Sequence, residues 1–333
     1  MALFFATLAS GSKGNAALVR LNQKTVLIDA GIPARTLKSR LGQLGLALSD
    51  ITECILTHTH SDHANGTAMQ ALANQGVLFR CHPSHEEALS AREGFLSLKE
   101  AGLVMHYGPL PFFTATGLEV APIELRHGAG MTFGFRINHH QPHADLTASV
   151  AYFADLGCWN DRISSYFSDC NLLAMEFNHD VAMTHASGRH PMIIARNLSD
   201  DGHLSNAQAA ALLRQLLARS GVMPGHVVLL HISHECNTRE LAVTSAESAI
   251  RECHDDYIPV VSALQDESVG WIPVSYRKIS KELAENIKPA SDMINPLNSQ
   301  KTEEVGPVGQ SHSARGRSRR RVSPNQLELA FPA

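Results

Sequence analysis

The stretch Cys54-Ile-Leu-Thr-His58-Thr-His60-Ser-Asp62-His63-Ala-Asn-Gly66 places four potential metal ligands within six residues, at the end of an apolar run. His58 and His60 are two residues apart, so on extended backbone they share a face. Asp62 and His63 are adjacent, so both reach a site only if the chain turns there, as between a strand and a helix. Such a loop can present two ligands to one metal and two to a neighbouring one. Aspartate and imidazole together suit Zn²⁺, Mn²⁺ or Fe rather than Ca²⁺ or Mg²⁺. The alternative is a polar turn whose side chains are solvated or cap the next helix.

Other apolar runs also end in histidine or aspartate. Asp29 closes Val26-Leu-Ile-Asp29, His127 follows Ile123-Glu-Leu-Arg, Asp155 follows Val150-Ala-Tyr-Phe-Ala, and His231 follows Val227-Val-Leu-Leu. For each position taken alone, a satisfied core residue or a helix-flanking residue is the competing interpretation.

Alternating strands and helices are predicted along the chain. Short apolar runs indicate strands at 3–9, 16–21, 25–29, 53–57, 77–81, 118–124, 132–137, 149–154, 171–175 and 227–231. Helices are expected at 34–41 behind Pro33, at 66–75, from a capping box of Ser84 and Glu87, and over 205–220 up to Gly221. Many short strands with interspersed helices imply layers of sheet and helix.

Composition excludes several classes of protein. The 333 residues are 44% hydrophobic and 18% charged, which is enough apolar material for a core and rules out wholesale disorder. The six cysteines have no CxxC spacing, so we expect buried thiols in a reducing compartment, the cytoplasm. No apolar run approaches the roughly 18 residues of a membrane helix. The apolar start, residues 1–9, lacks a basic region and is expected to be a core strand rather than a signal peptide. The 19 histidines direct the search to metal sites.

The C-terminal part of the chain differs from the rest. Residues 287–333 carry a net charge of +3 and include the basic cluster Arg315-Gly-Arg-Ser-Arg-Arg-Arg321, whereas the first 286 residues carry −7. We therefore expect one folded catalytic domain over 1–278 and a disordered basic tail over 279–333.

The His58-x-His60-x-Asp62-His63 run resembles the metallo-β-lactamase superfamily. That resemblance implies a four-layer αβ/βα sandwich with two metal ions between its sheets. It also implies that His58, His60 and His127 hold one divalent ion, that Asp62, His63 and His231 hold the other, and that Asp155 bridges them. Asp29 would support the ligand loop from behind. Two such ions, Zn²⁺ or Mn²⁺, would bring a bridging water near ionisation at neutral pH, so that its hydroxide attacks phosphorus or carbon. His60, where flavodiiron relatives carry Glu, favours hydrolysis over redox chemistry.

Four further stretches resemble the YycJ/WalJ-like branch, relatives of the RNase Z and RNase J nucleases. They are Ala9-Ser-Gly-Ser-Lys-Gly-Asn15, Glu176-Phe-Asn-His-Asp180, Gly202-His-Leu-Ser-Asn206 and His231-Ile-Ser-His-Glu-Cys-Asn237. The chain departs from the branch in two places. Gly128 follows His127 where an Asp is expected, and the stretch His190-Pro-Met-Ile-Ile-Ala-Arg196 retains little of an expected basic, aromatic pattern.

Candidate substrate contacts follow from these loops. His203 precedes the N-terminus of the strongest predicted helix, which attracts phosphate, so His203 is expected to bind the scissile phosphate or protonate the leaving oxygen alongside Asp62. A capping-loop role is the alternative. The loop with Ser10, Ser12 and Asn15 could offer backbone N–H groups to phosphate, or could be a plain hairpin connection. His179, Asp180 and Asn206 are weaker substrate-contact hypotheses.

The last residues contain Gln326-Leu327-Glu328-Leu329-Ala330-Phe331, which resembles the hexapeptide that bacterial replication and repair proteins dock into the sliding clamp. Leu327, Leu329 and Phe331 would supply apolar contacts and Gln326 a hydrogen bond at the pocket rim. The sequence thus predicts a metal-dependent DNA exonuclease of repair or replication. The alternatives are a small-molecule hydrolase, such as a glyoxalase II-like thioesterase or a lactonase, and a clamp-bound protein with a vestigial site.

Overall fold

Two mixed β-sheets form the centre of the computed structural model, which describes residues 2–128 and 130–278. The first sheet runs, in spatial order, β14 (Val269–Val274), β1 (Leu3–Ala9), β2 (Ala16–Leu21), β3 (Lys24–Ile28), β4 (Ile51–Ile55), β5 (Leu78–Cys81) and β6 (Val104–His106). The second runs β13 (Val260–Ser262), β12 (His226–Leu230), β11 (Leu172–Glu176), β10 (Leu146–Phe153), β9 (Thr132–Gln141), β8 (Glu119–Leu125) and β7 (Phe112–Phe113), with β15 (Arg277–Lys278) beside β10.

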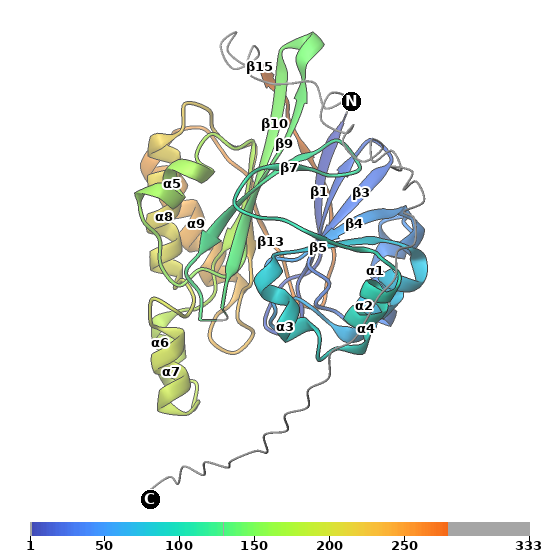
Figure 1. Ribbon diagram of the computed structural model, residues 1–333. Coiled ribbons are helices and arrows are strands. Elements are labelled where there is room, and N and C mark those ends of the chain that lie inside the picture. The colour runs from blue at the N-terminus through green and yellow to red at the C-terminus, as the bar shows by residue number, and fades with distance from the viewer. Residues whose placement is uncertain (1, 129, 279–333) are drawn as a thin grey trace, which may run out of the picture. The chain divides into compact units, whose positions relative to one another are not determined.

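Helices cover the outer face of each sheet (Figure 1). The first sheet carries α1 (Ala34–Gln43), α2 (Gly66–Gln75), α3 (Glu86–Leu89) and α4 (Glu93–Glu100). The second carries α5 (Asp161–Phe167), α8 (Asn206–Arg219) and α9 (Arg239–Cys253), while α6 (Val181–Ala186) and α7 (Pro191–Asn197) extend beyond the sheet. Short 3₁₀ turns lie at η1 (Leu48–Asp50), η2 (Pro83–His85) and η3 (Pro142–Ala144). The predicted four-layer αβ/βα sandwich is confirmed.

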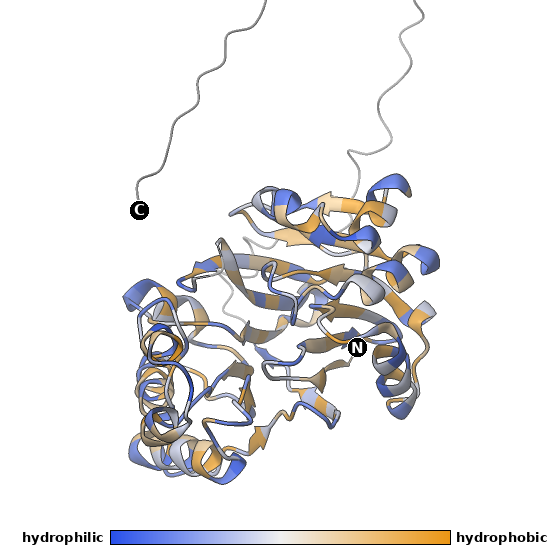
Figure 2. Cartoon of the chain, turned by 90° about the horizontal axis from the view of Figure 1, so that it is seen from below, coloured by the Kyte–Doolittle hydropathy of each residue, from blue (hydrophilic) through white to orange (hydrophobic). Residues whose placement is uncertain are grey.

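The core follows the two faces of the strands. In β10, Tyr152 packs in the cluster between the sheets, whereas the next residue, Phe153, packs under α5 and α8. Successive strand side chains point to opposite faces, so a strand buried on both faces is a continuous apolar run. This is why β10, β11 and β12 were predictable without any alternation in their sequence. Figure 2 shows hydrophobic residues concentrated on the strands and hydrophilic ones on the outward faces of the helices.

Local signals succeeded at one helix start and failed at another. Ser205 caps α8, because its side chain accepts a hydrogen bond from Gln208 N. Gln208 Oε1 in turn accepts from Ser205 N, and the two bonds make a capping box. The predicted box of Ser84 and Glu87 is wrong. His82 caps the 3₁₀ turn there by accepting from Ser84 N, and α3 begins only at Glu86.

The predicted strands all occur, with shifts of a few residues, but several elements were not predicted. Among them β14 matters most, because it pairs with β1 (Leu3 opposite Val274 and Phe5 opposite Ile272) and so joins a strand near the end of the described chain to the first strand. That pairing confirms residues 3–9 as a core strand. The predicted tail, including the clamp-like peptide, lies outside the described residues.

The cysteine prediction is only partly correct. All six cysteines are free thiols, and Cys54, Cys81, Cys170 and Cys236 are buried as expected. Cys158 is half-buried and Cys253 is exposed at the end of α9. Among the described residues no helix is long and apolar enough to cross a membrane.

Candidate metal centre

The ligand-rich loop turns between β4 and α2, as its sequence requires. His63 N and Ala64 N both donate to His60 O, at 3.0 Å each, so the chain reverses directly after the second histidine. Asn65 then caps α2 by accepting from Thr67 N and Ala68 N. The guanidinium of Arg92 donates to the carbonyls of Thr59 and Ala64 and holds the loop from outside.

Asp29 fixes this loop from behind. Its Oδ1 accepts from Thr57 N at 2.8 Å, and its Oδ2 lies 2.7 Å from His63 Nδ1. Asp29 is fully buried and has a left-handed backbone with φ of 60°. Such a conformation is costly for a residue other than glycine and persists where surrounding contacts impose it. Bonding at Nδ1 directs the opposite ring nitrogen of His63 toward the centre of the site, as the resemblance implied.

Three histidines form a first group. The ring centroids of His58 and His60 are 4.8 Å apart, and those of His127 lie 5.5 Å and 5.3 Å from them. Burial lowers the pKa of His58 and of His127, and burial together with His127 lowers that of His60 to about 4. All three imidazoles are therefore neutral at pH 7, which is the form that binds a metal.

A second group surrounds Asp155. Its Oδ2 lies 3.0 Å from His63 Nε2, and its Oδ1 lies 3.0 Å from His231 Nδ1 and 3.9 Å from His127 Nε2. Asp62 Oδ2 lies 3.6 Å from His63 Nε2 and 3.9 Å from His231 Nε2. The structure thus brings all seven predicted ligands together, with Asp155 between the two groups.

Charge distinguishes the second group from the first. Burial opposes protonation of His63 and His231, but Asp155 next to each raises the pKa of both imidazoles well above its ordinary value. Burial likewise opposes the charge of Asp155, but His231 and His63 hold the pKa of its carboxyl well below its ordinary range. The Asp155 carboxylate therefore stays ionised, and a cation at this position would compete with the protons of the two imidazoles.

The residues fit divalent metal ions. The Nε2 atoms of His58, His127 and His231 are buried and have no hydrogen-bond partner among the described residues. An unsatisfied buried polar atom costs about 1–3 kcal/mol, and three in one place are explained by a ligand that all of them bind. A donor set of imidazole and carboxylate groups suits divalent transition metals.

Glu176, at the end of β11, contacts both His203 and His231, although the sequence predicted no role for it in the site. Its Oε1 lies 2.7 Å from His203 Nδ1 and 3.2 Å from His231 Nδ1. Its Oε2 accepts from Leu156 N and Leu204 N, at 3.1 Å and 3.0 Å. Burial opposes its ionisation, but His203 and its hydrogen bonds lower the pKa of the carboxyl. One signal was available in the sequence, since Glu176 ends an apolar strand as the predicted ligands do.

The residues predicted to contact substrate differ in whether they line the cavity over the site. A cavity of about 190 Å³ opens over the site, and its lining consists of Ser12, His60, Asp62, His127, Asp155, Arg196, Asn197, Gly202, His203 and His231. Of the loop residues proposed to contact substrate, Ser12 lines this cavity. The loop itself is the β1–β2 hairpin connection, in which Asn15 Oδ1 accepts from Gly11 N. Ser10 Oγ accepts from His231 N, so this hairpin also holds the ligand loop of the second sheet.

The other three predicted contacts are held away from the cavity lining. Asp180 caps α6 by accepting from Met183 N, and the buried Asn206 side chain pairs with Asn237. His179 is 2% exposed, and neither of its ring nitrogens has a partner among the described residues. Substrate contacts by these three residues stay predictions. The hydrogen bonds of Asp180 and Asn206 stabilise the fold around them.

Comparison with known proteins agrees with this geometry. The model of the β-lactamase superfamily domain matches residues 24–232, which include every predicted metal ligand.

The chain belongs to the metallo-β-lactamase superfamily.

Within this superfamily the chain is 29% identical over 255 residues to a protein of Bacillus anthracis named exodeoxyribonuclease YycJ, covering 76% of this chain and 90% of the relative. It is 27% identical over 241 residues to exodeoxyribonuclease WalJ of Streptococcus pneumoniae, covering 72% and 84%. Among solved structures it resembles the metallo-β-lactamase fold protein YhfI of Bacillus subtilis, with a TM-score of 0.56, 15% identity and coverage of 80% and 98%. This superfamily member is a metal-dependent hydrolase whose histidine and aspartate groups suit divalent metal ions.

Proposed function

We propose that this metallo-β-lactamase-superfamily hydrolase is a phosphodiesterase that removes nucleotides from DNA during repair or replication. One observation carries the proposal: the cavity over the two ligand groups is small and is lined by polar residues and one glycine throughout. Pockets that enclose small organic ligands are generally larger, about 300–1,000 Å³, and mostly apolar. A cavity of about 190 Å³ suits a phosphodiester link whose bases stay outside. The names of the two curated relatives support DNA as the substrate.

The ligand set favours two divalent ions, Zn²⁺ or Mn²⁺, because Asp155 lies between the two groups, with its oxygens 3.0 Å from His63 and from His231 and 3.9 Å from His127. Bound there, the ions would supply Lewis acidity that polarises the phosphate and acidifies the attacking water. His58, His60 and His127 would hold one ion. Asp62, His63 and His231 would hold the other, with Asp29 orienting His63.

His203 is proposed as the proton donor to the leaving oxygen. Its Nδ1 is engaged by Glu176, which leaves Nε2 as the ring nitrogen available on the cavity side. A carboxylate behind an imidazole selects the tautomer and stabilises the protonated ring. Because Glu176 is also fixed by two backbone N–H groups, His203 has little freedom to rotate away from the reacting phosphate.

The alternative is a small-molecule hydrolase of the same fold, a glyoxalase II-like thioesterase or a lactonase. Both functions use the same metal ions, so the substrate separates them. A thioester or lactone needs an apolar surface for its acyl part, and no apolar side chain lines the cavity in the described residues.

Degradation of end-labelled single-stranded DNA with Mn²⁺ or Zn²⁺ tests the proposal. The wild-type chain should shorten the strand stepwise, and Asp62→Ala should lose this activity because it removes a ligand of the second group. Asp255→Ala, an exposed position in the loop after α9, is the matched control and should keep the activity. Thioester hydrolysis without DNA degradation would contradict the proposal.

Two further proposals concern the place of action. We propose that the chain acts in the cytoplasm and that Gln326, Leu327, Leu329 and Phe331 bind the sliding clamp, although these residues lie outside the described part of the chain. A pull-down with purified clamp should retain the full chain. Changing Gln326, Leu329 and Phe331 to Ala should abolish retention, and unchanged retention would exclude this contact.

A further inference from the structure

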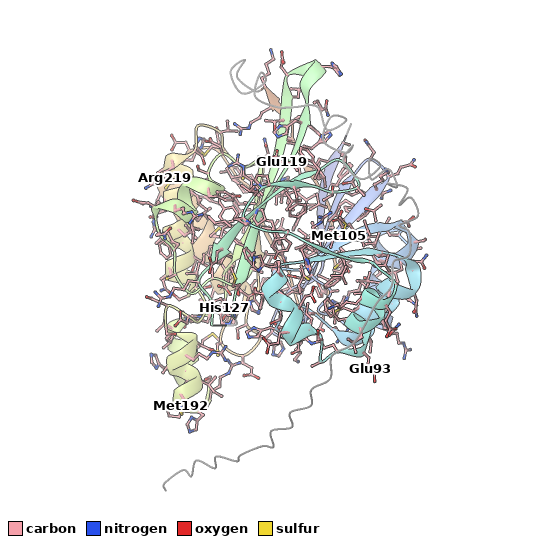
Figure 3. The ribbon with its side chains drawn as sticks, in the orientation of Figure 1. Glu93, Met105, Glu119, His127, Met192 and Arg219 are labelled. Carbon is pink, nitrogen blue, oxygen red and sulfur yellow. The ribbon has the colours of Figure 1, made fainter. Side chains whose placement is uncertain are left out.

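The described wall of the cavity carries one arginine, Arg196, in addition to its histidines and carboxylates. Arg196 lies near the C-terminal end of α7, on the helix that extends beyond the second sheet (Figure 3, where Met192 marks α7 and His127 the site). We propose that the Arg196 guanidinium binds a phosphate of the substrate strand beside the metal ligands. This inference rests on the proposed function and assigns a phosphate subsite within it.

Arg196 is not neutralised by its own loop. The two carboxylates that follow it in the chain, Asp200 and Asp201, are engaged by Arg126, whose Nη1 and Nε lie 3.3 Å and 2.8 Å from them. Among the described residues no ion pair involves Arg196. An exposed arginine at the edge of an anionic site would be expected to pair with a carboxylate unless the structure keeps the carboxylates elsewhere. Here Arg126 binds those carboxylates, so they do not pair with Arg196.

Gly128 leaves the space beside the guanidinium open. A Cβ atom built at Gly128 would lie 3.9 Å from Arg196 Nη2 and 3.2 Å from Asp201 O. Gly128 N donates to that same carbonyl at 2.8 Å, so the backbone directly after His127 is fixed. Any acidic side chain at this position would stand next to Arg196. Glycine therefore keeps the guanidinium available to an anion that enters the cavity.

The end of α7 is held in register with His203. His203 N donates to Asn197 O at 3.1 Å, and a Cβ at Gly202 would clash with the carbonyl oxygens of Arg196 and Asn197, each at 2.3 Å. This close backbone packing means that Arg196 and His203 move together. A phosphate bound by Arg196 would therefore lie next to His203 and the ligand groups, in the cavity that all of them line.

The chemistry of the guanidinium suits a phosphate. Its planar fork of N–H donors matches two phosphate oxygens, and the group stays charged at any working pH. A neutral thioester or lactone offers it no comparable partner. The subsite consequently selects phosphodiester substrates over the neutral esters of the alternative function.

Binding of inorganic phosphate to the metal-loaded full chain, measured by calorimetry, tests the subsite without nuclease activity. Arg196→Met should weaken phosphate binding about tenfold and raise the KM for DNA by a similar factor, and Arg196→Lys should recover part of the loss. The plot of log KM against log salt concentration should become shallower, by about the amount expected for the loss of one phosphate contact. Arg251→Met, an exposed arginine of α9, is the control and should change neither quantity.

A second variant approaches the same contact from the other side. Gly128→Asp should reproduce the loss seen with Arg196→Met, because its carboxylate would occupy the guanidinium, while Gly128→Asn, which is matched in size, should lose less. If Arg196→Met binds phosphate as the wild type does, the subsite is wrong even when DNA is degraded. If the wild type degrades no DNA, the proposed function fails, and the phosphate measurement still decides the subsite.

Discussion

The two ligand groups of the metal centre treat protons in opposite ways. His58, His60 and His127 have pKa values lowered chiefly by burial, whereas Asp155 raises the pKa of His63 and His231. The first group is ready to bind a metal at neutral pH, and the second holds protons where a cation would be. The Asp155 carboxylate contributes most to the raised pKa of both imidazoles, because it faces the second group more closely than the first, and Asp29 beside His63 and Glu176 beside His231 add to it.

Removing the Asp155 carboxylate should have the largest effect on the difference between the two groups. Asp155→Asn keeps the shape of the side chain but removes its charge, so the second group should lose its affinity for a cation. We expect turnover to fall by about a thousandfold or more, since the proposed hydrolysis would use an ion in each group. Metal analysis of the purified variant should show the bound content reduced relative to the wild type. Wild-type metal content together with wild-type turnover would contradict the assignment of Asp155.

Changes behind His203 should have the next largest effect. His203→Ala should lower kcat by about 10²–10⁴-fold, the usual contribution of a general acid, while the metal content is kept. Glu176→Gln should lower kcat less and shift the pH profile of kcat, because the imidazole loses its anionic partner. Glu87→Gln, an exposed glutamate of α3, is the control. Normal turnover of His203→Ala would refute the proton-donor role.

Proton release upon metal binding separates the two groups directly. At pH 7 a cation must displace protons from His63 and His231, whose pKa values are raised, but none from the first group. We expect release of about two protons per chain, measured by calorimetry in buffers of different ionisation enthalpy. The apparent metal affinity should accordingly rise with pH until these two histidines are neutral in the metal-free chain. Asp155→Asn should reduce the release, and an unchanged value would contradict the comparison.

His85 isolates the effect of burial in the smallest of these experiments. It is 2% exposed, lies outside the ligand groups and donates from Nε2 to Met131 O at 2.8 Å, and burial lowers its pKa to about 4. The unfolded chain takes up a proton near 6.5, so the free energy of unfolding should fall as pH drops from 6.5 toward 4, by about 1–3 kcal/mol. Urea unfolding measured at pH 7 and at pH 4.5 should show that the free energy of unfolding falls less in His85→Gln than in the wild type.

The exposed His143 supplies the matched control for that measurement. His143→Gln should lose as much stability in acid as the wild type does. An equal acid loss in His85→Gln would mean that burial of His85 does not contribute, and would weaken the burial argument for the first ligand group as well.

Prediction from sequence worked best where the controlling contacts are local or periodic. The turn after His60 follows from four polar side chains in six residues, and the capping box at Ser205 from residues three apart. Prediction failed where a neighbour distant in sequence decides. Ser84 and Glu87 have the spacing of a capping box, yet His82 takes the capping position. β14 is short and interrupted by Gly and Pro, and it is a strand because β1 offers it an unpaired edge.

By itself the sequence determined that several apolar strands end in histidine or aspartate, residue types that can bind metals, since that pattern is written in consecutive residues and in the continuous apolar runs of strands buried on both faces. Only the tertiary structure decided that Glu176 stands behind both His203 and His231, and that Arg126 takes the carboxylates near Arg196. Those relations join residues 27 to 75 positions apart. Their distances are set by how the strands and loops pack, which no local pattern encodes.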